Sequence, residues 1–274
     1  ASVAKVVLVV DRSYSMLMDE DRWTPMVTAL GEMTSTLDEL VDFGLMLFPN
    51  PAVANECAVG SVQIEPEPET GDNINLVLSL YGPDMEYGGT PTAESLAVAG
   101  EALVAMNPDG DNNYILLATD GGPGCNYDLD YLTCECLSEW CWELPANCLD
   151  DRRTIDTVLN LNLNGVKTFV IGIPGSEQFA TVLDEMAIAG GTAVNNQHYA
   201  VSGADELSNA LSATTGALVP CVYEVEQPVD DVNSVIVRID GVPIPHDVTH
   251  VNGWDYMDSN LHFYGEACAM LRDG

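Results

Sequence analysis

The feature that most constrains the fold is a regular alternation of short apolar runs with longer stretches of helical period. Val6 to Val10 is an unbroken aliphatic run, and apolar side chains then recur at three-and-four spacing from Trp23 to Val41. Pro25 directly after Thr24 marks the start of this second segment, because proline is favoured in a first helical turn. The pattern predicts a buried strand followed by an amphipathic helix.

The same unit repeats along most of the chain. We expect further strands at residues 43–48, 61–65 (an edge strand), 114–119, 168–173 and 198–201. We expect helices at residues 74–80, 92–106, 154–163 and 179–187, and one opened by Ser202-x-x-Asp205. Apolar strands separated by helices predict a doubly wound α/β domain over residues 1–217, with a mostly parallel sheet and helices on both faces. Ligands of such domains bind at the carboxyl ends of the strands.

The pattern changes from Val219 onward. Short alternating runs separated by turn signals predict strands at residues 222–225, 234–239 and 261–264, and no helical period is seen there. We therefore expect a small β-rich appendage over residues 218–274. A disulfide between Cys221 and Cys268 should close it, because so small a unit gains stability from a covalent link.

The chain is strongly acidic. Its 274 residues include 43 Asp and Glu against 8 Lys and Arg, which gives a formal charge of −35. Such a field repels polyanions, so it disfavours nucleic acid or an anionic bilayer as a partner. With 47% hydrophobic residues the chain can bury a full core. Its longest aliphatic run is far shorter than the roughly 18 residues of a membrane span, so no span is expected.

The cysteines indicate an oxidising compartment. An even number of cysteines crowded into loops is typical of disulfides formed outside the cytosol, so we expect a secreted or cell-surface protein with four disulfides. The eight residues are Cys57, Cys125, Cys134, Cys136, Cys141, Cys148, Cys221 and Cys268. A zinc site built from Cys134, Cys136, Cys141 and Cys148 is the alternative, but the spacing lacks the paired C-x-x-C units of such sites.

Three loops at one edge of the expected sheet carry oxygen donors. The first strand runs into Asp11-x-Ser13-x-Ser15, which places a carboxylate and two hydroxyls at alternate positions of a tight loop. Thr90 precedes a helix in a Gly-Gly-Thr-Pro-Thr sequence, and Asp120 follows the strand at residues 114–119. Asp and Ser also cap helices and turns, so the first motif alone is weak. Together the five donors predict a site for one Mg²⁺, Ca²⁺ or Mn²⁺ ion with an open coordination position.

This ordered set resembles the metal-ion-dependent adhesion site of von Willebrand factor A domains, in which D-x-S-x-S, a threonine and an aspartate recur in this order. The resemblance covers residues 3 to 216. It implies that Ser13 and Ser15 bind the cation directly, that Thr90 does so directly or through water, and that Asp11 and Asp120 act largely through water. Thr90 is chosen over the next threonine because sites of the family use the first of such a pair. Mg²⁺ is the preferred ion, with Ca²⁺ or Mn²⁺ as alternatives.

The chain departs from a minimal member of this family in two ways. Residues 124–150 form an insertion directly after Asp120, with five cysteines and the aromatic residues Trp140 and Trp142. We expect it either to shape a ligand rim, with the tryptophans as anchors, or only to cover the sheet edge. Cys57 should lie on the same edge and pair into the insertion, with Cys125 as the preferred partner among several. The β-rich tail is the second departure; similar domains with a cysteine-bounded tail resemble predicted surface proteins of bacteria such as myxobacteria.

The leading functional hypothesis is an extracellular binding module. Only two carboxylates lie in the expected site, so a bound dication keeps its attraction for an anionic ligand, and in the family the open position is often filled by a carboxylate of the partner. We expect a protein or surface glycan that bears a carboxylate or another oxygen donor. A metal-dependent hydrolase and a purely structural metal site are the alternatives, and we assign no catalytic residue because no acid or base is indicated near the serines.

Two weaker motifs complete the analysis. The acidic sequence at residues 109–113 has the chemistry of a calcium loop but lacks the distal glutamate of an EF-hand, so an ordinary turn is expected. His246 and His250 have a spacing that binds zinc on a helix. In the β context expected here we predict that their side chains do not converge.

Overall fold

The computed structural model describes residues 3–18, 20–84, 88–108, 112–137, 144–216, 218, 221–225, 229 and 231–273. Its centre is a six-stranded sheet in the order β3-β2-β1-β4-β5-β6. The strands are β1 (Ala4–Asp11), β2 (Val41–Phe48), β3 (Ser61–Glu67), β4 (Asn113–Thr119), β5 (Val166–Gly172) and β6 (Tyr199–Ala200). Only β3 runs antiparallel to its neighbour. The predicted mostly parallel α/β sheet, with its edge strand after β2, is confirmed.

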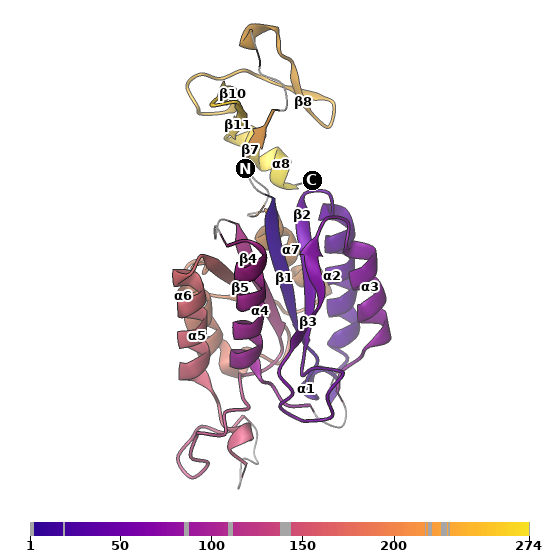
Figure 1. Ribbon diagram of the computed structural model, residues 1–274, viewed down its shortest axis with the longest axis vertical. Helices are drawn as coiled ribbons and strands as arrows, with labels where there is room; N and C mark the ends of the chain where they lie inside the picture. The colour runs from indigo at the N-terminus through magenta and orange to yellow at the C-terminus, as the bar shows by residue number, and fades with distance from the viewer. Residues whose placement is uncertain are drawn as a thin grey trace.

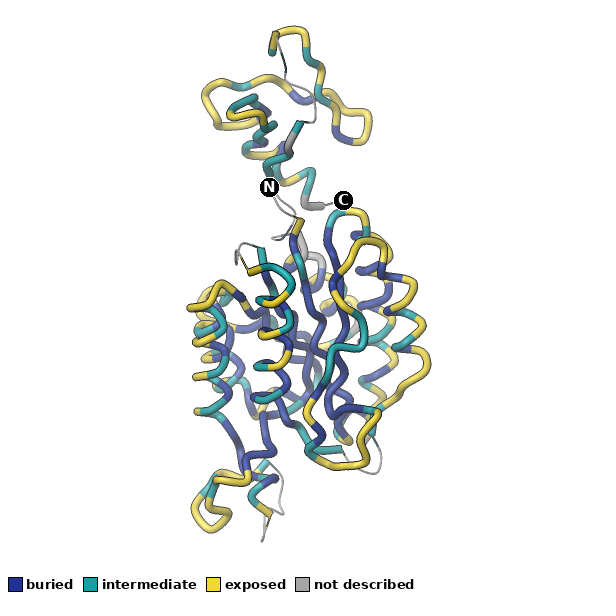
Figure 2. Tube along the Cα trace, in the orientation of Figure 1, coloured by how far each residue is buried: buried dark blue, intermediate teal, exposed yellow. Residues whose placement is uncertain are grey.

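Helices cover both faces of this sheet (Figure 1). They are α1 (Ser15–Met18), α2 (Trp23–Leu37), α3 (Gly71–Leu80), α4 (Thr92–Met106), α5 (Asp151–Leu163), α6 (Ala180–Ala189) and α7 (Ala204–Gly216). Alternate residues of β1 face opposite sides: Val6 and Leu8 join the core under α2, α3 and α7, while Val7 joins the core under α4, α5 and α6. Figure 2 shows the resulting buried sheet between partly exposed helices. This burial on both faces is why the strands are continuous apolar runs.

The C-terminal part forms two small antiparallel sheets and a helix. One sheet has the order β10-β11-β7, and the other pairs β8 with β9. The elements are β7 (Val222–Glu224), β8 (Val237–Ile239), β9 (Val242–Ile244), β10 (Gly253–Met257), β11 (Asn260–Tyr264) and α8 (Glu266–Asp273). They pack around Trp254 and Phe263, and the expected disulfide between Cys221 and Cys268 is present.

The prediction that this part contains no helix is wrong. Helix α8 has only 8 residues, which is too short for a convincing helical period in the sequence. It begins directly after Gly265, whose φ of +58° turns the chain out of β11, and Cys268 ties it to the start of the appendage. The division into units at residues 217 and 218 stays a prediction. Among the described residues, no helix is long and apolar enough to cross a membrane.

Candidate metal centre

The centre of the site is set by the pairing of two neighbouring strands. β1 and β4 run parallel, with Val10 beside Ala118, so both strands end at the same edge of the sheet. Asp11 is the last residue of β1, and Asp120 follows the last residue of β4. Their relative exposures are 0% and 2%, so both carboxylates are buried. The topology therefore brings together the two acidic residues that the sequence analysis assigned to one ion.

A chain of hydrogen bonds links four of the five predicted ligands. The backbone N–H of Ser13 donates to Asp11 Oδ1 at 2.8 Å. The Oγ atoms of Ser13 and Ser15 lie 3.0 Å apart, and Ser15 Oγ donates to Asp120 Oδ1 at 2.7 Å. Thr119, which the sequence analysis did not single out, donates its hydroxyl to Asp11 Oδ2 at 2.6 Å. The donors of the first and third loops thus form one connected cluster.

Thr90, the fifth predicted ligand, lies on the wall of an open cavity of about 390 Å³ that Ser15 and Asp120 also line. Its carbonyl oxygen accepts a hydrogen bond of 2.9 Å from the backbone N–H of Gly124 at the start of the insertion. The next threonine, Thr92, is buried at the start of α4. The structure therefore places Thr90, rather than Thr92, on the cavity.

The residue after Asp11 holds the first loop in place. Arg12 is buried, and its guanidinium donates to the carbonyl oxygens of Gly82 at 2.9 Å and Pro49 at 3.1 Å. It also forms an ion pair with Asp84. Because Arg12 is anchored by loops outside the cavity, the alternate residues Ser13 and Ser15 are left to turn toward the carboxylates.

Burial controls the electrostatics of the pair. Desolvation, followed by the charge of Asp120, raises the pKa of Asp11 to about 7, although hydrogen bonds from Thr119 and Ser13 oppose the shift. Desolvation also raises the pKa of Asp120, and hydrogen bonds from Ser15 and Arg22 oppose that shift. Two buried carboxylates whose charged forms are disfavoured gain free energy from a bound cation.

The donor set fits a hard divalent cation. All the donors are carboxylate or hydroxyl oxygens, which Mg²⁺, Ca²⁺ and Mn²⁺ prefer over imidazole or thiolate. Within the described part of the chain, no three His, Cys, Asp or Glu side chains are placed to hold a metal ion. An ion at this centre would therefore depend on the hydroxyls of Ser13, Ser15 and Thr90, and on water, in addition to the two carboxylates.

Arg22 is the charged residue of the site that the sequence analysis missed. Its Nη1 donates to Asp120 Oδ2 at 2.7 Å and to the carbonyl oxygen of Ser15 at 2.8 Å. The contact arises because the chain turns back after α1, where the Arg22 backbone N–H donates to the carbonyl of Met16. No spacing rule in the sequence signals such a return.

The insertion is fixed beside the cavity by disulfides. Cys57 bonds to Cys125, as expected from the sequence, and Cys134 bonds to Cys148. Cys136 is also disulfide-bonded. The alternative of a zinc site built from Cys134, Cys136, Cys141 and Cys148 is therefore wrong, because a thiolate committed to a disulfide cannot bind zinc.

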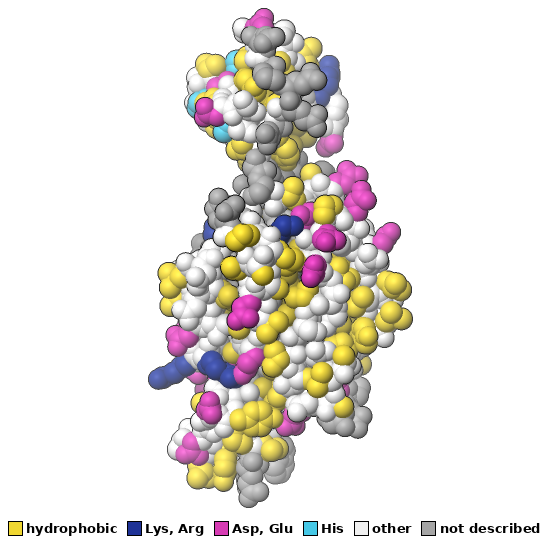
Figure 3. Space-filling view, viewed as in Figure 1, with side chains coloured by type: hydrophobic (Ala, Val, Ile, Leu, Met, Phe, Trp, Pro, Cys, Tyr) yellow, Lys and Arg dark blue, Asp and Glu magenta, His cyan; other side chains and the backbone are white. Residues whose placement is uncertain are grey.

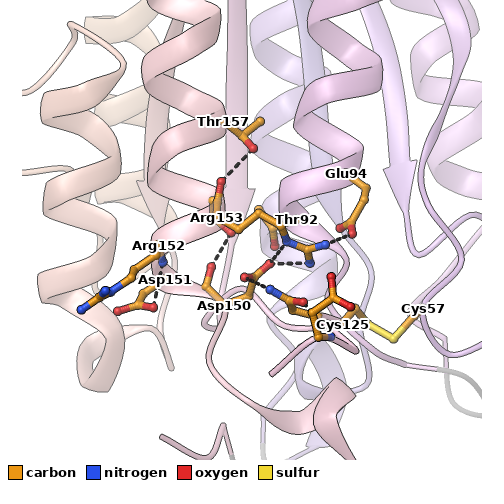
Figure 4. A network of polar contacts seen from close by, with 12 residues as sticks. Cys57, Thr92, Glu94, Cys125, Asp150, Asp151, Arg152, Arg153 and Thr157 are labelled. Carbon is orange, nitrogen blue, oxygen red and sulfur yellow. Dashed lines mark hydrogen bonds and ion pairs between the residues drawn. A yellow bond between two sulfur atoms is a disulfide. The ribbon is translucent and has the colours of Figure 1, made fainter. Parts of the chain in front are cut away.

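Polar contacts anchor the base of the insertion to the helices (Figure 4). The buried carboxylate of Asp150 accepts hydrogen bonds from Asn126 Nδ2 at 2.7 Å and from Arg153 Nε at 2.6 Å. Arg153 also forms an ion pair with Glu94 on α4. The network joins both ends of the insertion to α4 and α5.

Part of the insertion borders the cavity, where Leu137, Ala146 and Asn147 line the wall. Its outer surface carries exposed Tyr127 and Leu132, and Figure 3 shows hydrophobic side chains gathered at this end of the molecule. Trp140 and Trp142, the predicted rim anchors, lie outside the described residues. Their role stays a prediction.

The prediction that His246 and His250 do not converge is wrong. His246 Nε2 lies 2.9 Å from Asp255 Oδ1, and His250 Nε2 lies 2.8 Å from Asp255 Oδ2. The turn between the histidines is curled because the Asp247 carboxylate accepts hydrogen bonds from three backbone N–H groups of residues 249–252. His250 itself has a φ of +61°. The calcium-loop motif at residues 109–113 lies partly outside the described residues, and Asn112 has the left-handed φ of 64° that is typical of a turn.

No protein-family model and no curated protein sequence matches this chain. Solved structures do match its fold. The pilus adhesin SpaC from Lactobacillus rhamnosus GG aligns with a TM-score of 0.60 at 15% identity, over 97% of this chain and 38% of the adhesin. Proximal thread matrix protein 1 from the mussel byssus aligns with a TM-score of 0.52 at 17% identity, over 81% of this chain and 51% of that protein. A further structure of the mussel protein is described as having a zinc-occupied MIDAS motif.

The fold is von Willebrand factor A-like. The PilB minor pilin from Streptococcus sanguinis is a third match, with a TM-score of 0.54 at 15% identity, over 78% of this chain and 61% of the pilin. The chain thus spans less than two thirds of the length of each of these three proteins. At such identities the likeness establishes the von Willebrand factor A-like fold alone.

Proposed function

We propose that this chain is an extracellular binding module that holds one divalent cation and uses it to bind an oxygen donor of a partner. Asp11, Ser13, Ser15, Thr90 and Asp120 are the proposed ligands. The observation that carries the proposal is the connected cluster of carboxylates and hydroxyls at an open cavity. Mg²⁺ is the preferred ion, with Ca²⁺ or Mn²⁺ as alternatives.

The small number of formal charges supports a binding role for the ion. Asp11 and Asp120 carry at most two negative charges, so a dication is not over-compensated and stays attractive to an anionic ligand. The proposed partner is a protein or surface glycan that presents a carboxylate or similar oxygen. Because the cavity is open to solvent, such a group can reach the ion.

The extracellular location is supported by the disulfides and by the structural neighbours. Three disulfides join described cysteines, and such bonds persist in oxidising environments. The neighbours named above are an adhesin, a pilin and a byssus matrix protein. We extend the proposal to a bacterial surface protein, the class that the cysteine-bounded tail resembles.

Hydrolysis receives no support from the cavity. Its described lining residues include no histidine or glutamate, and the carboxylate beside Ser15, that of Asp120, is paired with Arg22. The hydroxyl of Ser15 is instead bound to Asp120, in the arrangement expected of a ligand.

Calorimetric titration of the chelator-treated protein with Mg²⁺, Mn²⁺ and Ca²⁺ tests the metal centre. We expect one-to-one binding that is lost in Asp11→Asn and in Asp120→Asn, because each variant removes one of the two charges. Asp72→Asn is the matched control, since Asp72 is exposed in the first turn of α3. Unchanged binding in both site variants would overturn the proposal.

Ligand binding is tested separately with the metal-loaded protein on arrays of glycans and of extracellular matrix proteins. Retention that disappears both with chelator and in Asp120→Asn supports the proposed module. Retention that is insensitive to chelator would place the ligand site elsewhere.

A further inference from the structure

Arg22, which directly precedes α2, places a positive charge in the proposed metal centre. Arg22 Nη1 contacts Asp120 Oδ2 at 2.7 Å and the Ser15 carbonyl at 2.8 Å, and both acceptors belong to loops that carry proposed ligands. The side chain of Arg22 is 14% exposed and that of Asp120 is 0% exposed. The ion pair is therefore largely shielded from water. As a result, the attraction between its charges is only weakly screened.

The guanidinium of Arg22 fits closely against the surrounding backbone. Gly175, after β5, packs directly against it: a Cβ at this position would lie 2.6 Å from Arg22 Cζ. Gly175 also has a φ of +107°, which side-chain-bearing residues rarely adopt. The backbone N–H of Arg22 is fixed to the Met16 carbonyl. The packing of Gly175 against the guanidinium and the backbone hydrogen bond to Met16 together keep the side chain of Arg22 at Asp120.

One polar atom of the Arg22 side chain has no hydrogen-bond partner among the described residues. Arg22 Nε is buried, and no hydrogen-bond partner for it is found in the described part of the chain. Burying a donor without a partner is unfavourable. The contacts of Nη1 with Asp120 and Ser15 offset this cost.

The charges of the centre can then be counted for the cation-binding form, in which both carboxyl groups are ionised. Asp11 and Asp120 then supply two negative charges and Arg22, which is paired with Asp120, supplies one positive charge. A bound dication would bring the total to plus one, whereas without Arg22 the total would be zero. The cation and the guanidinium would also share the carboxylate of Asp120. If the guanidinium stays at Oδ2, it repels the cation; if it leaves, its ion pair with Asp120 is lost. In both cases the affinity for the cation falls.

We propose that Arg22 is a built-in counter-cation of the centre, which neutralises Asp120 while the divalent cation is absent and thereby lowers the affinity for that cation. This inference rests on the proposed function. A lower affinity shifts half-filling of the site to a higher cation concentration, so the centre would respond to external divalent cations at higher concentrations than it would without Arg22.

The test compares cation binding by Arg22→Gln, Arg22→Lys and the wild type. The three chelator-treated proteins are titrated calorimetrically with Mg²⁺ and Mn²⁺. Arg22→Gln removes the charge and keeps hydrogen-bonding groups, while Arg22→Lys keeps the charge. Arg152→Gln is the matched control, because Arg152 lies on α5 and points away from the polar network in Figure 4.

We expect Arg22→Gln to bind the cation about ten-fold more tightly or better, a gain that corresponds to about 1.4 kcal/mol. Arg22→Lys should bind less tightly than Arg22→Gln, and Arg152→Gln should match the wild type. Thermal unfolding gives a second readout: Arg22→Gln should unfold at a lower temperature than the wild type in chelator, and saturating Mn²⁺ should narrow the difference.

A measurement on the wild type avoids any failure of a variant to fold. The NMR signal of the Arg22 Nε–H group should move during Mg²⁺ titration and saturate together with the calorimetric signal. Two outcomes would overturn the proposed role of Arg22 and leave the metal centre intact. One is an Arg22 signal that does not move although the wild type binds the cation, and the other is equal or weaker cation binding by Arg22→Gln than by the wild type. Binding by Arg22→Gln but not by the wild type supports the counter-cation and overturns the proposed function. Binding by neither overturns both.

Discussion

Removal of the disulfide between Cys57 and Cys125 should lower the free energy of unfolding by about 4 kcal/mol. The two cysteines are 68 residues apart in the sequence, so the bond closes a long loop in the unfolded chain. In the chain-entropy treatment the stabilisation grows with the logarithm of loop length. The double variant Cys57→Ser with Cys125→Ser removes the link without leaving a free thiol.

The matched comparison is the disulfide between Cys134 and Cys148, which are only 14 residues apart. The same treatment assigns it about 3 kcal/mol, so the two double variants should differ by roughly 1 kcal/mol. Urea unfolding followed by far-ultraviolet circular dichroism measures both. The urea midpoint should be lower for the Cys57 and Cys125 variant than for the Cys134 and Cys148 variant.

The longer link should also affect the cavity. A Cβ at Gly89 would lie 2.9 Å from Cys125 Sγ, so the disulfide packs closely against the residue that precedes Thr90. We expect cation affinity to fall in the Cys57 and Cys125 double variant as well. An equal or smaller loss of stability than in the Cys134 and Cys148 variant would refute the loop-entropy reasoning.

Three further predictions concern the metal centre. In chelator, the free energy of unfolding should fall as pH rises from about 4 to about 7, because the folded-state pKa of Asp11 lies above its unfolded value and protonation therefore favours the folded state. Urea midpoints of Asp11→Asn should lack this fall, and a rise of the wild-type midpoint over this range would contradict the prediction. Gly175→Ala should destabilise the chain by roughly 1–3 kcal/mol, since φ is +107° and the new Cβ meets Arg22, and calorimetry should show tighter cation binding as the guanidinium is displaced. A cation at about 100 times its dissociation constant should stabilise the wild type by about 2.7 kcal/mol in thermal unfolding, with no such gain in Asp120→Asn.

The sequence predicted the sheet because burial on both faces makes its strands readable. All 8 residues of β2 are buried, so the strand has no polar face that could be confused with a loop or a helix. The predictions for the C-terminal part were poorer, because α8 and the turn from Asp247 to Asn252 depend on local hydrogen bonds and a short helix rather than on periodicity. The convergence of His246 and His250 on Asp255 follows from that turn.

The candidate site divides in the same way. Asp11 and Asp120 could be placed together because each follows a strand, and parallel strands end at one edge. Arg22 could not, since the turn that returns it to Asp120 is held by a backbone hydrogen bond to Met16, which no residue pattern in the sequence signals. Thr119 was read only as the last residue of a strand, although its hydroxyl binds Asp11.

The disulfides also define how a pulling force would travel through the molecule. A partner held at the cavity and drawn away loads the insertion, which borders that cavity. From there a covalent path runs through Cys125 and Cys57 to the loop after β2, a strand held by neighbours on both sides. A pull on the insertion is therefore carried by a covalent bond to the loop after β2, as well as along the chain to β4 and α5 at the ends of the insertion.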